Sequence, residues 1–177
     1  MTEAESEGVL ADGTRPATPE ELLARLDALD IAVTTVRHRP VFTVEEARAH
    51  RSATVGAHVK NLFVRDKKGP MWLVVALEHR AIDLKSLAQS LGHKRFSFAS
   101  PRRLMARLGV IPGAVTPFAV VNDHEGVVRV ALDRGLEDYE LWNFHPLDNA
   151  MTTTIRGADM LRFLEAEGHA PHWMDLA

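Results

Sequence analysis

Two neighbouring apolar segments constrain the fold of this 177-residue chain more than any other feature. Residues 60–65 (KNLFVR) and 71–77 (MWLVVAL) are rich in the β-branched, aromatic and aliphatic side chains that suit strands. Between them, residues 66–69 (DKKG) have the composition of a turn. The segment therefore predicts an antiparallel hairpin, and any fold for this chain must contain a β-sheet.

Helix signals alternate with predicted strands along the rest of the chain. Thr18 begins a capping box, with proline at the first helical position and Glu21 at the third, and leucines follow on one face. Asp83 and Ser100 are expected to cap two more helices. The expected helices begin and end near residues 18–29, 44–50, 83–92, 100–109 and 157–167.

Further strands are expected over residues 32–37, 96–98, 139–144 and 152–155, and a second hairpin over residues 118–122 and 127–132. Because strands and helices are interspersed, the sequence predicts an α+β fold: a single domain with a mixed, mostly antiparallel sheet and packed helices. Residues 1–17 are small, polar and acidic. They are expected to form a flexible N-terminal tail ahead of a domain over residues 18–177.

Composition excludes several classes of protein and site. The chain has no cysteine, which excludes disulfides, thiolate metal sites and cysteine nucleophiles. Its nine histidines are scattered without an HExxH pattern, and no nucleophile elbow or phosphate-binding glycine loop is present. We therefore expect no metal and no cofactor. No apolar run is long enough to span a bilayer, and the acidic N-terminus lacks the pattern of a secretory signal. A cytoplasmic monomer with no membrane partner is the expectation.

Charge is distributed unevenly along a chain whose net charge is −3. Residues 1–50 balance to −5, residues 51–107 to +9 and residues 108–177 to −7. A basic middle third in an acidic protein is a candidate face for a polyanion. The alternative is that this block of sequence forms no continuous surface.

Three short segments carry polar or glycine-rich patterns that a plain core does not need. Lys60 and Asn61 enter an otherwise apolar strand, although such a lysine can simply point to water at a strand edge. The loop at residues 109–117 (GVIPGAVTP) holds two glycines and two prolines, and can bring backbone N–H groups close to a ligand or serve as a rigid connector. His145 lies in a polar cluster at a strand end, where histidines often have structural roles.

Taken together, these segments resemble the prolyl-tRNA synthetase-associated, or YbaK-like, editing domain family. Within it they are most similar to the free-standing alanyl-tRNA(Pro) deacylases called ProXp-ala. The likeness runs from about residue 18 to residue 172 in consistent order. The stretches that carry it are residues 39–47, 60–69, 83–85, 91–92, 96–99, 108–118, 121–123 and 144–147.

The resemblance implies a hydrolase that removes wrongly attached alanine from tRNA(Pro), and it assigns roles to residues of this chain. The catalytic residues would be Lys60, Asn61, Gly113 and His145. The substrate-binding residues would be Val41, Phe42, Leu62, Ala114, Val115, Thr116 and Pro117. The tRNA-binding residues would be Lys94, Arg95, Arg102 and Arg103. Many relatives are expected to carry serine at position 114, so alanine there is a departure that a loop acting through backbone N–H groups would tolerate.

An aminoacyl ester is already activated, so water attack with stabilisation of the oxyanion suffices for its hydrolysis. The Gly113 loop would supply the donors, and Lys60 would hold a phosphate or the terminal ribose. A base role for Lys60 remains the alternative. A small pocket would exclude proline by size, because a missing methylene offers a synthetase only about 1–3 kcal/mol of discrimination.

Other functions stay open at the level of sequence. The pocket could prefer cysteine or serine, or the domain could bind tRNA without hydrolysis. The expected partners are the acceptor end of tRNA(Pro) and, as a candidate, prolyl-tRNA synthetase.

Overall fold

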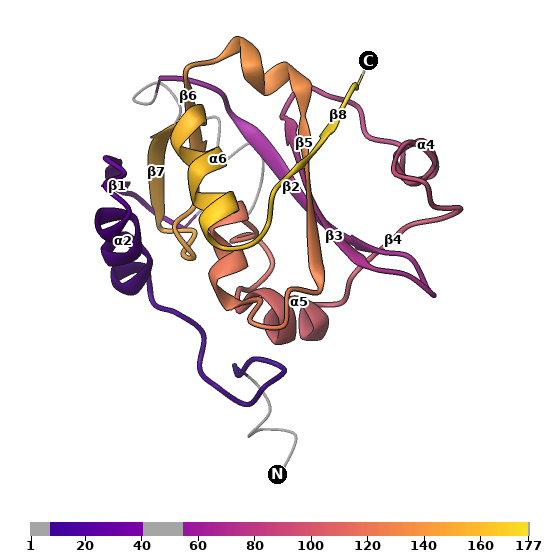
Figure 1. Ribbon diagram of the computed structural model, residues 1–177, viewed down its shortest axis with the longest axis horizontal. Coiled ribbons are helices and arrows are strands. Elements are labelled where there is room, and N and C mark those ends of the chain that lie inside the picture. Colours follow the sequence, from indigo (N-terminus) through magenta and orange to yellow (C-terminus); the bar gives the residue numbers. More distant parts are fainter. Residues whose placement is uncertain (1–7, 41–54, 177) are drawn as a thin grey trace.

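The computed structural model describes residues 8–40 and 55–176, and its strands form two sheets (Figure 1). The three-stranded sheet has the order β1-β7-β6, with β1 at Thr34–Arg37, β6 at Leu141–Phe144 and β7 at Met151–Arg156. The five-stranded sheet has the order β4-β2-β3-β5-β8, with β2 at Val59–Arg65, β3 at Met71–Leu77, β4 at Ser97–Phe98, β5 at Val128–Asp133 and β8 at His172–Met174.

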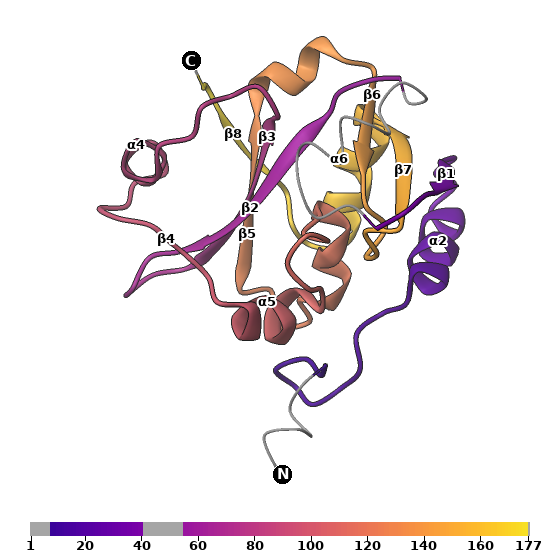
Figure 2. The same ribbon diagram turned by 180° about the vertical axis from the view of Figure 1, so that it is seen from behind.

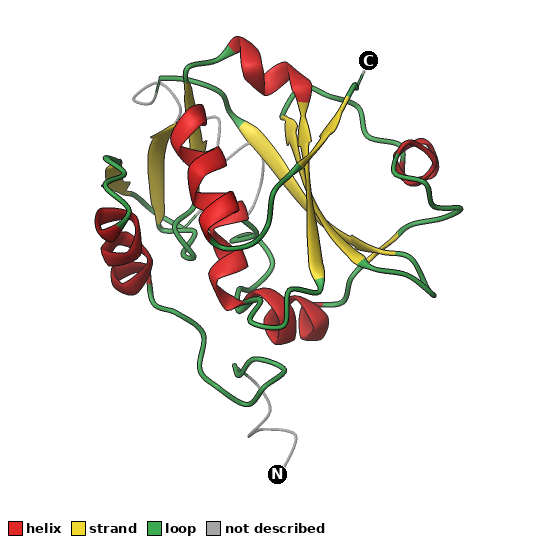
Figure 3. Cartoon of the chain, viewed as in Figure 1, coloured by secondary structure: helices red, strands yellow, loops and turns green. Residues whose placement is uncertain are grey.

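The helices are α2 (Pro19–Ala28), α4 (Leu84–Ser90), α5 (Pro101–Leu108) and α6 (Gly157–Ala166), with 3₁₀ helices η2 (Pro117–Asn122) and η3 (Arg134–Asp138) (Figure 3). Helices α2, α4 and α5 begin directly after the predicted capping residues, and the other helices were given no predicted cap. Thr18 accepts a hydrogen bond from the Glu21 amide at 3.1 Å, which completes the capping box. Asp83 and Ser100 cap α4 and α5 in the same way. The helix expected at residues 44–50 lies outside the described residues.

The α+β class and the first hairpin are confirmed. Strands β2 and β3 pair antiparallel over their full length, from Val59 opposite Leu77 to Arg65 opposite Met71. The sequence indicated one mixed sheet, whereas the described strands divide into two. Antiparallel pairs predominate, but β3 pairs parallel with β5, and β5 pairs parallel with β8.

The prediction of a second hairpin is wrong. Residues 117–122 form η2 rather than a strand, because Pro117 has no N–H to donate to a ladder and the Thr116 hydroxyl caps the Phe118 amide at 3.3 Å. Strand β5 instead pairs in parallel with β3, which is its neighbour in the sheet although distant in sequence. Strand β8 was not predicted, since three residues with a single buried side chain leave little pattern in the sequence.

The two sheets meet just before β2. Ala57 forms a parallel bridge with Trp142 of β6. The Asn143 side chain strengthens this junction: its amide donates to the carbonyls of Val55 and Ala57, at 2.8 and 3.1 Å, and its oxygen accepts from Thr154 at 2.6 Å. These bonds tie the start of β2 to β6 and β7, so the ends of both sheets that carry the predicted site residues lie next to each other.

The large sheet buries a different cluster on each face. On one face Phe63, Leu73 and Val75 belong to the main core, which also contains side chains of α2, α5, η2, β6 and α6. On the other face Val64 and Val74 pack with α4. Figures 1 and 2 show α4 standing on the opposite side of the large sheet from α2 and the small sheet.

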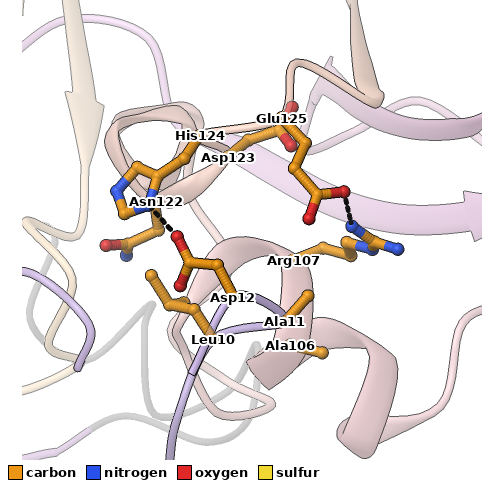
Figure 4. Close-up of a pocket in the computed structure, with 9 residues that line it drawn as sticks. All are labelled: Leu10, Ala11, Asp12, Ala106, Arg107, Asn122, Asp123, His124 and Glu125. Atoms are coloured by element: carbon orange, nitrogen blue, oxygen red, sulfur yellow. Dashed lines mark hydrogen bonds and ion pairs between the residues drawn. The ribbon is translucent and has the colours of Figure 1, made fainter. Parts of the chain in front are cut away.

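Residues 8–17 contact the domain, which differs from the flexible tail expected there. Leu10 is buried, and the Ala11 amide donates to the carbonyl of Ala106 in α5. The Asp12 carboxylate pairs with His124 at 2.7 Å (Figure 4). The Ala17 amide donates to Asn122 at 2.9 Å. This part of the N-terminal segment is therefore docked against α5 and η2 through apolar and polar contacts.

Candidate functional site

Lys60 and Asn61 lie next to each other on β2 but point to opposite faces of the sheet, because side chains alternate along a strand. The register places Asn61 opposite Val75, on the main-core face, and Lys60 opposite Ala76, on the α4 face. Strand β4 pairs only with Val64 and Arg65, so the edge of β2 at Lys60 and Asn61 has no partner strand among the described residues. A ligand that contacts both side chains must cross this open edge.

The Lys60 side chain is half-buried, and its ammonium donates to the backbone carbonyl of Arg80, just beyond β3. An ammonium group has three N–H donors, so this bond leaves donors for an anionic or hydroxylated ligand. The Arg80 carbonyl therefore sets the direction in which the Lys60 cation points.

Asn61 contributes a polar atom with an unmet hydrogen-bonding need. Its side-chain oxygen is buried and has no hydrogen-bond partner in the described part of the chain. Leaving a buried acceptor unpaired costs about 1–3 kcal/mol, and such atoms are rare in folded proteins. The Asn61 oxygen is therefore ready to accept a hydrogen bond from a ligand donor.

His145 is held in one tautomer at the end of β6. Its Nδ1–H donates to the Met151 carbonyl at 2.7 Å, so Nε2 carries the lone pair. Burial lowers the pKa of His145, the neighbouring His38 adds to this effect, and the Met151 hydrogen bond opposes it. At neutral pH His145 is therefore an uncharged acceptor, with the His38 ring centroid 6.1 Å away.

The bridge between the sheets joins the two segments that carry Lys60 and His145. Ala57 and Trp142 pair in parallel, and both segments run in the same direction from that point. Lys60 lies three residues beyond Ala57, and His145 lies three residues beyond Trp142. These two predicted site residues, far apart in sequence, are thus on neighbouring segments.

The loop at residues 113–117 approaches from the core side. Phe118, directly after the loop, packs edge-on against Phe144 with ring centroids 5.8 Å apart, and Phe144 precedes His145. The Ala114 amide is committed to the Ile111 carbonyl at 3.0 Å. The amides of Gly113, Val115 and Thr116 have no acceptor in the described part of the chain, so these three are the available donors.

The predicted substrate-binding residues have different environments. The side chains of Ala114, Thr116 and Pro117 are buried, so they shape the loop and could meet a ligand only through the backbone. Val115 and Leu62 are half-buried. Val41 and Phe42 lie outside the described residues. Ala114 belongs to the main core, so its methyl group is buried among apolar side chains.

Four exposed basic residues follow α4 along the chain. Lys94, Arg95, Arg102 and Arg103 are all exposed, and no acidic residue occurs between Asp83 and Asp123. We call these four residues the basic surface. Its first half follows His93, whose Nε2 accepts from the Trp72 indole at 3.1 Å and whose Nδ1–H donates to Asp66 at 3.0 Å. These two bonds fix the backbone next to Lys94 and Arg95.

Phe98 is a candidate binding residue that the sequence analysis did not single out. It lies on β4 between the two halves of the basic surface, and 62% of its surface is exposed. Phe96, two residues earlier, faces the same side and is only 3% exposed. The sequence shows that the two phenylalanines lie on one face. It does not show that α4 packs over Phe96 and leaves Phe98 exposed.

The described residues contain no group of three or more histidine or carboxylate side chains placed to hold a metal ion. Within the same residues, no helix combines the length and apolar character needed to cross a membrane.

Comparison with known proteins identifies the family. The sequence profile described as "Aminoacyl-tRNA editing domain" matches residues 38–163, which include every predicted site residue. The chain belongs to the aminoacyl-tRNA editing domain family. This confirms the family resemblance found in the sequence.

Two curated relatives of this editing domain are similar over nearly their full length. The "Prolyl-tRNA editing protein ProX" of Acetoanaerobium sticklandii is 39% identical over 151 residues, covering 85% of this chain and 92% of that protein. The "Prolyl-tRNA synthetase associated domain-containing protein 1" of Xenopus laevis is 40% identical over 157 residues, covering 86% and 93%. A crystal structure described as that of a candidate trans-editing enzyme for prolyl tRNA synthetase has a TM-score of 0.68 at 20% identity, covering 90% and 97%, and supports the fold.

Proposed function

We propose that this editing domain hydrolyses the ester between alanine and the 3′ end of tRNA(Pro), acting in trans on mischarged tRNA. The observation that carries the proposal is the buried, unpaired oxygen of Asn61, in a chain whose curated relatives include a prolyl-tRNA editing protein. An aminoacyl ester has an α-ammonium group, and this cation is the donor that a lone buried acceptor lacks.

The proposed reaction is direct attack by water on the ester carbonyl carbon. The carbonyl oxygen becomes an oxyanion, the bond to the ribose oxygen breaks, and the ribose oxygen leaves with a proton. The amides of Gly113, Val115 and Thr116 are the candidate donors to the oxyanion. One such preorganised donor is worth about 3–4 kcal/mol of the activation barrier. His145 Nε2, kept neutral by burial, would accept a hydrogen bond from a ribose hydroxyl or from the attacking water.

Lys60 would position the substrate rather than accept a proton. Its ammonium already donates to a backbone carbonyl, which holds this side chain in one position. The donors left over can hold a phosphate or a ribose hydroxyl. Because Lys60 and Asn61 face opposite sides of β2, the 3′ end would cross the open edge of this strand, with its phosphate and its amino acid on different sides.

The test of the function is a comparison of charged tRNAs. We expect rapid deacylation of alanyl-tRNA(Pro), with prolyl-tRNA(Pro) left intact because the larger side chain is shut out of the site. The rate of ester loss would be measured with purified protein. The same assay would be run with cysteinyl- and seryl-tRNAs. Hydrolysis of one of these, with alanyl-tRNA(Pro) left intact, would replace alanine as the assigned amino acid. Binding of all these tRNAs with no turnover would establish a non-catalytic binding module.

The basic surface and Phe98 are proposed to grip the acceptor end of the tRNA. Replacing Arg95 with alanine should weaken tRNA binding and reduce the slope of log K against log salt by about 1, because one phosphate contact is lost. Phe98→Ala should also weaken binding, by about 1–3 kcal/mol if one base stacks on the ring, but leave the salt slope unchanged. Both would be measured by equilibrium binding of uncharged tRNA(Pro) at several salt concentrations.

Arg156 supplies the matched control for the basic surface. It is exposed and cationic but lies at the end of β7, away from α4 and α5. Arg156→Ala should leave the affinity and the salt slope as in the wild type. Equal losses for Arg95→Ala and Arg156→Ala would mean that tRNA senses only the overall charge of the protein.

A further inference from the structure

Asp133 is a fully buried carboxylate to which the proposed reaction assigns no role. It lies at the end of β5 with an exposed fraction of 0%. Its oxygens accept hydrogen bonds from the Leu77 amide at 3.0 Å, the Gly135 amide at 2.9 Å, and Arg80 Nε and Nη2 at 3.0 and 3.4 Å. A buried carboxylate is costly unless it is paired and fully hydrogen-bonded, and Asp133 meets both conditions.

These bonds converge on the turn that follows β3. Leu77 is the last residue of β3, and Arg80 lies three residues further on, with its amide donating to the Leu77 carbonyl. Asp133 therefore holds this turn at two points, through the Leu77 backbone and through the Arg80 guanidinium. The packing is close, since a Cβ on Gly135 would lie 2.6 Å from Arg80 Nη2.

The same turn holds the side chain of Lys60. The Arg80 carbonyl accepts a hydrogen bond from the Lys60 ammonium, and the guanidinium of this residue is bonded to Asp133. A residue anchored at its side chain and at its amide has little freedom to rotate its carbonyl. The position of the Lys60 cation thus depends on a carboxylate two strands away in the sheet.

We propose that Asp133 and Arg80 are positioning residues for Lys60: their ion pair fixes the Arg80 carbonyl, which in turn directs the Lys60 ammonium toward the 3′ end of the tRNA. This inference rests on the proposed function for the part that concerns catalysis. The part that concerns the position of Lys60 stands on the free protein and can be tested there.

The experiment combines two readouts on Asp133→Asn. The first is the ¹H–¹⁵N NMR signal of the Lys60 side-chain ammonium in the free protein, assigned with Lys60→Ala. In the wild type a hydrogen-bonded ammonium exchanges slowly and gives a signal, and in Asp133→Asn this signal should shift or broaden beyond detection. The second is deacylation of alanyl-tRNA(Pro). Misplacing a positioning group by about 1 Å can cost 100-fold in rate, so we expect kcat to fall about 10- to 100-fold with little change in tRNA affinity.

Two further variants guard against a general loss of structure. Gly135→Ala keeps both Asp133 and Arg80 in the sequence but crowds the Arg80 guanidinium, the Leu77 side chain and the Asp133 carboxylate, and should also shift or broaden the Lys60 signal. Asp175→Asn removes the exposed ion pair that Arg134 makes at 2.7 Å, one residue along the chain from Asp133, and should change neither readout. Thermal unfolding of each variant would set a temperature at which all are folded.

The outcomes separate the inference from the function on which it rests. An unchanged Lys60 signal in Asp133→Asn, or no protected ammonium signal in the wild type, overturns the positioning role. Asp133→Asn should have no further effect on the rate in a Lys60→Ala background, and an equal loss in both backgrounds would also overturn it. If no charged tRNA is hydrolysed by the wild type but the Lys60 signal depends on Asp133, the proposed function fails and the positioning of Lys60 stands.

Discussion

Lys60→Ala should lower the rate of alanyl-tRNA(Pro) deacylation by at least about 100-fold, because positioning and electrostatic groups in active sites are typically worth this much. Lys60 is half-buried on β2, its ammonium is directed by the Arg80 carbonyl, and the bridge between the sheets joins the start of its strand to the segment that leads to His145. Single-turnover deacylation would measure the chemical step without a contribution from product release.

Two variants show whether the charge of Lys60 is responsible. Lys60→Met keeps the apolar stem and removes the ammonium, so it should lose as much activity as Lys60→Ala. Lys85→Ala removes an exposed lysine from the first turn of α4 and should leave the rate unchanged. A Lys60→Met protein that works within a few-fold of the wild type would show that the cation is not needed and would remove Lys60 from the proposed site.

The largest effect on stability is expected at Asp123. Its side chain is 1% exposed and pairs with His169, whose side chain is 4% exposed, at 2.8 Å. The carboxylate also accepts from the amides of Val127 and Val128 at 3.1 and 2.8 Å. These bonds join the turn after η2 to the end of α6. Breaking a buried pair by removing one partner typically costs about 3–5 kcal/mol, and Asp123→Asn should reduce the free energy of unfolding by about this amount.

The pH dependence of this loss follows from both partners. Burial opposes ionisation of Asp123, but hydrogen bonds from His169 and the two amides outweigh it and lower the pKa of Asp123 below its ordinary 3.8. Burial likewise opposes protonation of His169, but the bonds to Asp123 and to the Glu167 carbonyl raise the pKa of His169 above its ordinary 6.5. The contribution of Asp123 is present above pH 3.8 and is lost as pH falls through the lowered pKa. The contribution of protonated His169 is present below pH 6.5 and is lost as pH rises through the raised pKa.

Denaturant unfolding at several pH values would check this prediction. The difference between wild type and Asp123→Asn should be largest between pH 3.8 and 6.5 and should shrink on either side. The matched control is Asp12→Asn, which breaks a second aspartate–histidine pair of similar length but with exposed partners. Exposed pairs contribute little because water screens them, so the control should change stability only slightly. A pH-independent difference for Asp123→Asn would contradict a charged pair.

Local interactions made much of the fold predictable from the sequence. The capping box at Thr18 and the caps at Asp83 and Ser100 involve residues no more than three positions apart. The β2–β3 hairpin is likewise formed by neighbours joined through a short polar turn. Such contacts depend little on the rest of the chain, and they appear where the sequence analysis placed them.

Contacts between segments far apart in the chain could not be predicted from the sequence patterns. The apolar run at residues 118–122 has the composition of a strand, but its packing against Phe144 and Phe163 belongs to a 3₁₀ helix. Strand β8 exists because β5 offers it an edge. Residues 8–17 looked polar enough to be loose, yet Ala11 and Asp12 find partners more than ninety residues away.

In the candidate site, too, the sequence identified residues whose arrangement only the structure shows. The sequence named Lys60, Asn61, Gly113 and His145 as catalytic residues, and their roles stay predictions. It could not show that Lys60 and Asn61 face opposite sides of β2, that the Ala114 amide is already bonded, or that Phe98 is exposed while Phe96 is covered.

By itself the sequence determined the residue types at the site, the family, and the elements whose signals are local: capping boxes, a tight hairpin and helix stops. The tertiary structure alone decided how those elements pair, that the Ala114 amide of the loop is already bonded, and that Asp133 reaches Lys60 through Arg80. The physical reason is range. Caps and turns are fixed by bonds between near neighbours in the chain, whereas the direction of a site lysine is fixed by carbonyls and carboxylates that only the folded sheet brings within hydrogen-bonding distance.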